Sequence, residues 1–472
     1  MSNSIDVSRE LEVGKLSGVS LASLSLASFF PAVGIALVPL LVLSTAGPTA
    51  WQSSLLASIA VVCVGFSVTA FARKYVATGS LYSYVGEVFG PWARYVTGAA
   101  LLGGFVVAVG ALAGVLGIFA GSFLYGRGMT NALEAGPQLA ITAIAIAIAF
   151  AIAYRGLDTS VKVAVTLALI SLPLVIVISV ASVLHTGFDL AVQLDFGSAS
   201  LGGTLHGVAL GAAFLVGFES CAALAMEARD PRRSVPLAVM SVPVVLGAIF
   251  PIVTLMQVPG LIAAGDSLAA GVSAPAALAL QSGLGEGVAT ASDVVLAVAT
   301  FAALIGFLNF GARFVKTLAE DGLLPRRIAI VHSRHRSPYV GLILIGLGGA
   351  AVIAVLLVLT GDVASAYYTV APLVVYLWVV PYVLISVGAV RLALRDKQTR
   401  IGLITTAVIG GAGMAWAYID GLINPPPTPA DAMSWVVLIV IVVLPLIFIV
   451  TARRTSKPGR PLAPEAPEHT AA

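Results

Sequence analysis

Charged residues are scarce in this chain. Asp, Glu, Lys and Arg together make up only 10% of its 472 residues, whereas 59% of the residues are hydrophobic and the mean hydropathy is +1.03. A soluble globular chain carries about 25% charged residues. This shortage of charge excludes a soluble enzyme, an intrinsically disordered chain and a nucleic-acid-binding protein.

Cysteine and histidine are also rare, with two and five residues respectively. Cys63 and Cys221 both lie inside apolar runs, which excludes a disulfide framework and leaves the redox compartment open. His332 and His335 have a spacing that metal sites use, but they lie in a strongly basic segment, which favours a solvated loop. We therefore expect neither a metal site nor a cofactor.

Long apolar runs dominate the rest of the sequence. A membrane-spanning helix needs about 20 predominantly apolar residues. Twelve runs meet this requirement, at residues 18–44, 49–71, 92–120, 137–155, 160–184, 204–227, 236–258, 288–316, 339–360, 363–391, 401–422 and 433–452. The sequence therefore predicts an all-α polytopic membrane protein with twelve transmembrane helices.

The two ends of the chain are polar. Residues 1–17 have mixed charge and lack the pattern of a cleaved signal peptide, so we expect a cytoplasmic N-terminal segment. Residues 453–472 are rich in Pro and Ala, which is typical of a disordered cytoplasmic tail. The 48 glycines and 25 prolines are scattered among the apolar runs instead of forming a linker, as is usual in membrane helices.

The basic residues predict the orientation in the membrane. If both termini are cytoplasmic and the loops alternate, 24 of the 25 Lys and Arg residues fall on the cytoplasmic side, and only Arg127 falls outside. This is the bias of the positive-inside rule. We therefore expect a multi-pass protein of the cytoplasmic membrane. Because the outer loops are short, any chemistry must take place inside the helical bundle.

Span six contains the most informative residue. Glu219 is the only acid that we place deep in a predicted span, and because charge is costly in lipid, such an acid is a functional candidate. Gly217 lies two residues earlier and lets the backbone leave helical geometry, since glycine lacks a Cβ atom. The alternative is that Glu219 only forms a hydrogen bond with a neighbouring helix.

Span one carries a matching interruption. Pro31 lacks an N–H group and therefore frees a carbonyl group near mid-span, and Gly34 follows it. Interruptions in corresponding helices of two halves indicate the midplane binding site of a transporter. Because spans one and six are five helices apart, the two halves must have opposite orientations. We predict an inverted 5+5 repeat of residues 18–184 and 204–391, with two added helices in residues 401–452.

Four segments carry a family resemblance. They are residues 217–236 in span six, residues 313–338 after span eight, residues 79–84 after span two, and Ala32-Val33-Gly34 with Pro39 in span one. On these motifs, residues 15–400 resemble a bacterial member of the amino acid–polyamine–organocation (APC) superfamily of permeases. The resemblance implies a leucine-transporter-like fold, with the first and sixth helices broken around a central substrate site. It also implies an amino acid or an amine as the substrate.

The paired interruptions and the resemblance together select the substrate-binding candidates. These are Ser28, Pro31, Ala32, Val33, Gly34, Phe214, Gly217, Phe218, Glu219, Ser220 and Asn309. The N-termini of half-helices suit a carboxylate, and their C-termini suit an ammonium group. For Asn309 the alternative to lining the central cavity is a hydrogen bond to a neighbouring helix. Ala32 and Val33 stand where many relatives have Gly and Ser, which removes a hydroxyl group from this site.

Three classes of function compete. Interrupted helices, one deep acid and short loops favour a secondary active transporter that works by alternating access. The sequence contains no HExxH, no paired intramembrane aspartates and no Walker A motif, which disfavours a polytopic membrane enzyme and an ATP-driven pump. A signalling receptor would need a larger extramembrane domain. A neutral amino acid is the favoured solute, with a polyamine or other small organic amine as the alternative, and the oligomeric state stays open.

Glu219 is also the candidate for energy coupling. Burial disfavours its charged form, so the side chain is suited to bind and release a proton, which predicts proton-coupled or exchange transport. A sodium site between spans one and eight would need several oxygen ligands, and Thr300 is the only hydroxyl nearby. Proton-coupled relatives carry a lysine deep in helix five, and this chain lacks it. Exchange of one solute for another without a proton therefore stays an alternative.

Overall fold

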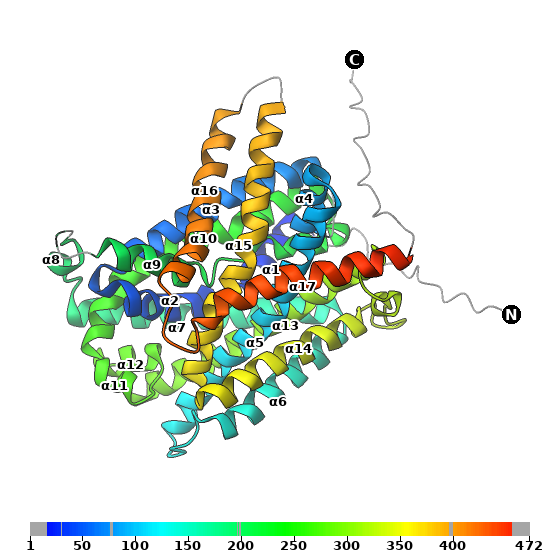
Figure 1. The fold of residues 1–472 in the computed structure, drawn as a ribbon. Coiled ribbons are helices and arrows are strands. Elements are labelled where there is room, and N and C mark those ends of the chain that lie inside the picture. The colour runs from blue at the N-terminus through cyan, green and yellow to red at the C-terminus, as the bar shows by residue number, and fades with distance from the viewer. Residues whose placement is uncertain are drawn as a thin grey trace.

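The chain folds into a bundle of helices (Figure 1). The computed structural model describes residues 17–29, 31–75, 79–195, 197, 200–395 and 400–455. Most of the predicted N-terminal segment and of the predicted tail lies outside these residues. The described residues contain no strand, and only an isolated antiparallel bridge joins Glu134 to Asp362.

Long helices alternate with short connecting helices along the chain. The α-helices are α1 (Gly18–Ser28), α2 (Pro31–Ala46), α3 (Trp51–Lys74), α4 (Leu81–Phe89), α5 (Pro91–Tyr125), α6 (Ala135–Tyr154), α7 (Leu157–Thr186), α8 (Leu190–Gln193), α9 (Leu201–Ala212), α10 (Pro231–Ala263), α11 (Gly265–Ala269), α12 (Ala274–Gln281), α13 (Gly285–Glu320), α14 (Tyr339–Thr360), α15 (Val363–Arg395), α16 (Ile401–Ile423) and α17 (Ala432–Thr455). The 3₁₀ helices are η1 (Gly47–Thr49), η2 (Phe218–Glu227) and η3 (Arg326–Ala329).

Ten segments of the described residues are long and apolar enough to cross a membrane, and the first of them runs over both α1 and α2. The fold is therefore that of an all-helical polytopic membrane protein, as predicted. The predicted fifth and sixth spans are not among the ten. In the predicted fifth span, the described apolar stretch of α7 is limited to residues 170–186, which is shorter than the ten candidate spans. Most side chains in the first half of α7 lie outside the described residues. The sixth span divides into α9 and η2, each well short of about 20 residues. The twelve-helix count stays a prediction.

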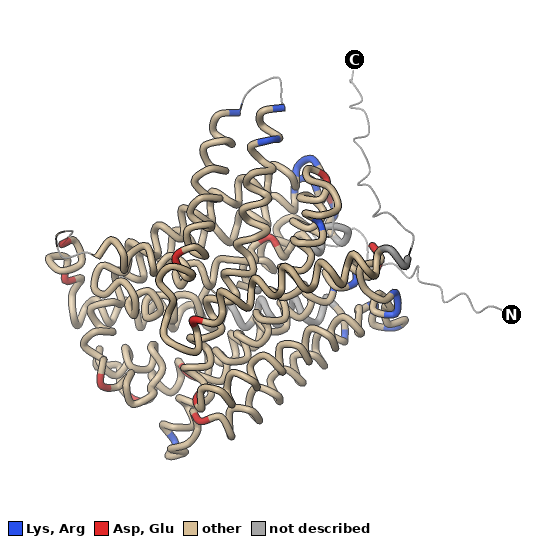
Figure 2. The backbone as a smooth tube through the Cα atoms, viewed as in Figure 1, with Lys and Arg blue, Asp and Glu red and all other residues tan. Residues whose placement is uncertain are grey.

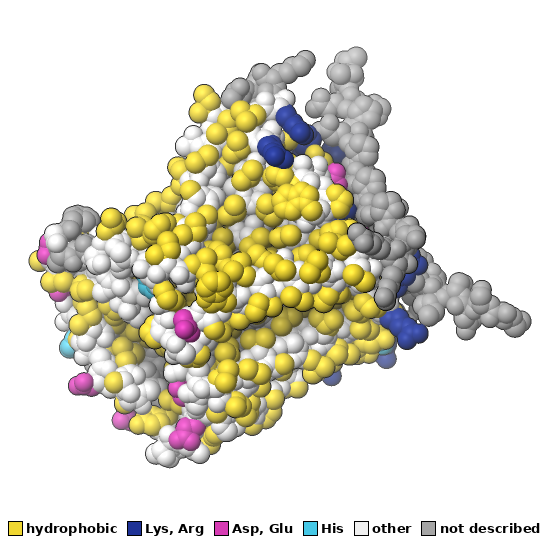
Figure 3. Space-filling view, viewed as in Figure 1, with side chains coloured by type: hydrophobic (Ala, Val, Ile, Leu, Met, Phe, Trp, Pro, Cys, Tyr) yellow, Lys and Arg dark blue, Asp and Glu magenta, His cyan; other side chains and the backbone are white. Residues whose placement is uncertain are grey.

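The outer helices expose large hydrophobic side chains. Examples are Ile144 and Ile148 of α6, Leu347, Val358 and Leu359 of α14, and Ile439, Val442 and Leu446 of α17. Figure 3 shows hydrophobic side chains spread over most of the visible face. A soluble protein seldom exposes so wide an apolar surface, whereas lipid tails cover such a surface without cost.

Charge is segregated on the bundle. In Figure 2, most Lys and Arg residues lie along the upper and right-hand edges of the view, whereas most Asp and Glu residues lie toward the lower and left-hand edges. Between these edges Figure 2 shows only a few acidic residues and almost no basic ones. This separation is the arrangement that the distribution of basic residues in the sequence predicts for two sides of a membrane.

Three long helices, α5, α13 and α15, form the centre of the bundle. Helix α5 packs against both α13 and α15, and α14 and α17 pack against its outer side. Small residues permit the closest approach: a Cβ atom at Gly110 of α5 would lie only 2.9 Å from the carbonyl oxygen of Gly349 in α14. The central helices lie beside the region where α1 and α9 end and α2 begins.

Candidate substrate-binding site

Two pairs of helix ends meet inside the bundle. Helix α1 ends at Ser28, and α2 begins at Pro31, a first position where the missing N–H group costs nothing. Helix α9 ends at Ala212, and a turn over residues 213–217 leads into η2. These helix ends lie within the predicted spans one and six, and their role as the breaks of two membrane helices stays a prediction.

Gly217 sets the course of the chain after α9. Its φ of +85° lies in the left-handed region, where a side chain would strain the backbone. A Cβ atom there would also come within 3.1 Å of the Trp378 ring. The Gly217 N–H donates to the Tyr382 hydroxyl at 2.7 Å, and its carbonyl accepts from the Ser220 N–H at 2.8 Å. Glycine is therefore required at this turn for both backbone geometry and space.

Glu219 lies one residue into η2 and is almost completely buried, with 1% of its surface exposed. Its Oε1 accepts a hydrogen bond from Trp378 Nε1 at 2.9 Å, and its Oε2 accepts one from the Tyr382 hydroxyl at 2.7 Å. Both donors belong to α15 and are four residues apart, so they lie on one face of that helix. The carboxylate thereby ties the irregular segment after α9 to α15.

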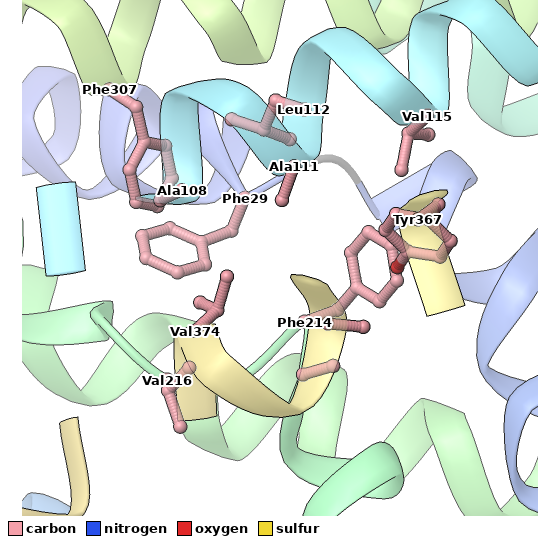
Figure 4. Close-up of a pocket in the computed structure, with 12 residues that line it drawn as sticks. Phe29, Ala108, Ala111, Leu112, Val115, Phe214, Val216, Phe307, Tyr367 and Val374 are labelled. Atoms are coloured by element: carbon pink, nitrogen blue, oxygen red, sulfur yellow. The ribbon is translucent and has the colours of Figure 1, made fainter. Parts of the chain in front are cut away.

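A small cavity of about 50 Å³ opens beside the two interruptions. Figure 4 shows its lining, with Phe29 and Phe307 toward one end and Phe214 and Tyr367 toward the other. The lining residues are Phe29, Ala108, Ala111, Leu112, Val115, Ala213, Phe214, Val216, Phe307, Tyr367, Ala371 and Val374. They come from the segments after α1 and α9 and from α5, α13 and α15. Eleven of these twelve side chains are pure hydrocarbon.

The predicted residues of span six lie at or near this cavity. Phe214 lines it, and Gly217 and Glu219 follow on the same segment. Phe218 is buried and packs against the Tyr382 ring, with 5.4 Å between the ring centroids. Ser220 is buried, and its hydroxyl has no hydrogen-bond partner among the described residues.

The predicted residues of span one lie beside the cavity but not in its lining. Pro31, Ala32 and Val33 form the first turn of α2 and are wholly or partly buried, and the Ser28 side chain lies outside the described residues. At Gly34, an added Cβ atom would collide with the ring of Phe250 in α10. Gly34 therefore permits close packing of α2 against α10.

Asn309 bonds within its own helix. Its Nδ2 donates to the Ile305 carbonyl at 3.0 Å, and its Oδ1 accepts from Arg313 Nη1 at 3.0 Å. It is absent from the cavity lining, and neither of these bonds crosses to another helix. The role of Asn309 in substrate binding stays a prediction.

Glu219 is not the only buried acid, because Asp293 of α13 has only 3% of its surface exposed. Asp293 lies inside the predicted eighth span, close to its start. Its Oδ2 accepts from the Ser122 hydroxyl at 2.7 Å, and its Oδ1 accepts from the Ser273 hydroxyl.

Sequence reasoning also missed most of the cavity lining. Phe307, Ala111 and Val374 are apolar residues in apolar helices, and nothing in such a pattern separates a cavity wall from ordinary packing. Trp378 and Tyr382 carried a usable signal: two aromatic side chains with hydrogen-bond donors stand four residues apart in one apolar span. A buried acid in another span needs such donors.

Comparison with known proteins identifies the family. The sequence profile of the family described as "Amino acid permease" matches residues 16–455. An uncharacterized transporter of Mycobacterium tuberculosis is 25% identical over 372 residues, which are 76% of each chain. The branched-chain amino acid permease BcaP of Bacillus subtilis is 26% identical over 309 residues, 63% of this chain and 65% of the relative. BcaP of Lactococcus lactis is 32% identical over 142 residues, 29% of each chain.

The profile covers all of the described helices, including both interruptions and every residue of the cavity lining. A family of this kind carries a small molecule through a membrane, which agrees with the apolar surface and with a cavity inside the bundle. It also separates a transporter from the alternative of a polytopic membrane enzyme. The chain belongs to the amino acid permease family and is a multi-pass membrane transporter.

Proposed function

We propose that this protein is a secondary active transporter that moves an apolar amino acid across the cytoplasmic membrane. The observation that carries the proposal is the hydrocarbon-lined cavity beside the helix ends at Ser28 and Ala212. Alternating access takes place around these two interruptions, which are the breaks of helices 1 and 6 in the inverted 5+5 repeat. The substrate is held there while the surrounding helices open to one side and then to the other.

The helix ends suit the two charged groups of an amino acid. The first N–H groups of α2, at Ala32 and Val33, have no acceptor within the helix and lie at the positive end of the helix dipole, which favours a carboxylate. The last carbonyl groups of α1 and α9 lie at negative helix ends, which favours an ammonium group. Backbone groups thereby replace the side-chain hydroxyl that is missing at positions 32 and 33.

The lining indicates an apolar side chain on the substrate. The cavity of about 50 Å³ is above the roughly 10–15 Å³ that one water needs, so it offers room for a small hydrocarbon group. The BcaP relatives, named for branched-chain amino acids, support this class. A polyamine would need carboxylates, yet the described cavity lining contains none, and Glu219 is bound by Trp378 and Tyr382.

Coupling to protons or pure exchange is proposed over coupling to sodium. Glu219 ties η2 to α15, so a proton on this carboxylate would weaken the hydrogen bond from Trp378 or Tyr382 and loosen the segment. Uptake into vesicles with an imposed pH gradient, measured with and without sodium, tests this point. Uptake that follows sodium and ignores the pH gradient would contradict it.

The proposed orientation places both termini and the loop around Ser333 in the cytoplasm, with Ser200 outside. Single cysteines at Ser200 and Ser333, in a Cys63→Ala/Cys221→Ala background, should react with an impermeant reagent from opposite sides. Reaction of both from the outside would contradict the twelve-helix topology.

Uptake of radiolabelled solutes into proteoliposomes tests the substrate class. Valine, leucine and isoleucine should be taken up, whereas lysine and putrescine should not. Ala111→Leu fills the cavity from α5 and should abolish uptake. The matched control is Ala143→Leu, which adds the same side chain on the exposed face of α6 and should transport normally. Uptake of putrescine but not leucine would favour the amine alternative.

A further inference from the structure

A second hollow lies apart from the apolar cavity. It is a cleft of about 960 Å³ between the C-terminal ends of α3 and α15, the N-terminal end of α16, and α4. Five of its fifteen lining residues are cationic: Arg73, Lys74, Arg391, Arg395 and Arg400. It shares no lining residue with the apolar cavity. Figure 2 shows Lys and Arg at the ends of α15 and α16 and around α4.

Most of the cationic side chains in the cleft have no ion pair among the described residues. Among the described lining residues the one acid is Glu87, which forms an ion pair with Arg94 at 3.4 Å. Within the described part of the chain, no carboxylate forms an ion pair with Arg73, Lys74, Arg391 or Arg395. The Arg391 guanidinium instead lies over the Phe89 ring, 4.5 Å from its centroid. The cleft is therefore an electropositive site for an anion.

The wall of the cleft changes from basic to hydrocarbon along α3. Phe66, Ala70 and Arg73 lie at intervals of four and three residues and so share one face of this helix. Seven residues of helix cover about 10 Å. Phe66 is 45% exposed at the apolar end, and Leu403 of α16 adds to the hydrocarbon surface. A ligand that fills the cleft needs an anionic head and an apolar body.

We propose that this cleft binds an anionic phospholipid, with the phosphate among Arg73, Arg391 and Arg395 and an acyl chain along Phe66 and Leu403. Basic pockets between membrane helices on the cytoplasmic side bind such headgroups. A free phosphate would use only the cationic end and would leave the hydrocarbon wall uncovered. The inference is independent of the transported solute, because the two hollows have separate linings.

The test is native mass spectrometry of the full-length protein in detergent, titrated with phosphatidylglycerol or with phosphatidylcholine. Wild type should retain phosphatidylglycerol in preference to phosphatidylcholine. Arg73→Gln/Arg391→Gln/Arg395→Gln should weaken the binding of phosphatidylglycerol on the order of 100-fold. The matched control, Arg326→Gln/Arg327→Gln/Arg334→Gln, removes three exposed basic residues outside the cleft and should bind as wild type does.

Two further experiments complete the test. The first asks whether the positive charge or the shape of the arginine side chains binds the lipid, and the second asks whether free phosphate binds in place of the lipid. Arg73→Lys/Arg391→Lys/Arg395→Lys keeps the charge and should retain most of the binding, and equal loss in the Lys and Gln variants would overturn the proposal. Millimolar inorganic phosphate should not displace the lipid. Full displacement by phosphate, or undiminished phosphatidylglycerol binding in the Gln variant, would also overturn it.

Discussion

Glu219 and Asp293 are two buried acids of the same bundle, and each accepts two hydrogen bonds. The donors to Glu219 are the Trp378 indole and the Tyr382 hydroxyl, both from α15. The donors to Asp293 are two serine hydroxyls, Ser122 from α5 and Ser273 from the turn before α12. Glu219 therefore joins the irregular segment after α9 to one central helix, α15. Asp293 lies in the central helix α13 and joins it both to α5 and to the connecting segment before α12.

The chemistry of the donors separates the two sites. An indole N–H can only donate, and the Tyr382 oxygen already accepts from the Gly217 N–H, so both groups require an acceptor at Glu219. Each serine oxygen also accepts a backbone N–H, Ser122 from Ser273 at 3.0 Å and Ser273 from Ala276 at 3.4 Å, but its second lone pair can accept another hydrogen bond when the hydroxyl hydrogen rotates. The Glu219 site is thus committed to a carboxylate, whereas the Asp293 site can adapt to another polar group.

Glu219→Ala should have the largest effect on stability. It leaves the Trp378 N–H and the Tyr382 hydroxyl without an acceptor inside the bundle. At about 1–3 kcal/mol for each unsatisfied group, the free energy of unfolding should fall by about 2–6 kcal/mol. Denaturant unfolding in detergent micelles measures the change. Glu286→Ala, on the exposed first turn of α13, is the control, and a loss no greater than in this control would contradict the account.

Glu219→Gln should have the next largest effect. The amide keeps one acceptor oxygen, so either the indole of Trp378 or the hydroxyl hydrogen of Tyr382 loses its partner. The expected loss is about 1–3 kcal/mol in the free energy of unfolding. Uptake driven by a pH gradient should also fall to background in proteoliposomes. Full pH-dependent uptake by this variant would show that Glu219 is structural.

Asp293→Asn is the same chemical change at the adaptable site. One serine hydroxyl can turn and accept a hydrogen bond from the new amide, so the loss should stay below about 1 kcal/mol. The same unfolding assay measures it, and the two amide variants should be compared under one condition. Equal losses in Glu219→Gln and Asp293→Asn would remove the distinction between fixed and rotatable donors.

A third acid extends the comparison to the edge of the bundle and should show the smallest effect. Burial raises the pKa of the Asp321 carboxyl, and the Tyr82 hydroxyl, which donates to it at 2.7 Å, offsets part of this rise. A raised pKa in the folded state contributes stability below the unfolded value of about 3.9, and this contribution is lost as the pH rises through the folded value. Relative to Asp321→Asn, wild type should lose stability as the pH rises from about 4. The unfolding midpoints of both proteins across this range measure the difference, and a relative gain by wild type would contradict the assigned direction.

Sequence reasoning found those features of the site that break a pattern. Glu219 is a charge in an apolar run, Gly217 is a flexible residue beside it, and Pro31 is a helix interrupter, so each was recognisable alone. The all-helical membrane fold followed from apolar runs of sufficient length. These properties depend on local composition and on the cost of charge in lipid.

The features that sequence reasoning missed depend on contacts between distant segments. Phe29 and Phe307 meet with 5.4 Å between their ring centroids although 278 positions separate them in the chain. Tyr367 lies near the start of α15, where a tyrosine is usual at a membrane surface, yet it is buried and lines the cavity. An apolar side chain has the same appearance in a sequence whether it packs against a neighbour or faces a cavity.

The central claim is that the hydrocarbon-lined cavity holds the substrate, and protection of a cysteine in its wall tests this claim most directly. Val374→Cys, in a Cys63→Ala/Cys221→Ala background, places a thiol in the lining with little change in volume. The measurement is the rate at which a small maleimide alkylates this thiol, with Ser333→Cys as a reference outside the cavity. Saturating leucine should slow alkylation at position 374 several-fold, whereas lysine should not, and position 333 should respond to neither. If Val374→Cys still transports leucine while leucine leaves its alkylation rate unchanged, the substrate binds elsewhere.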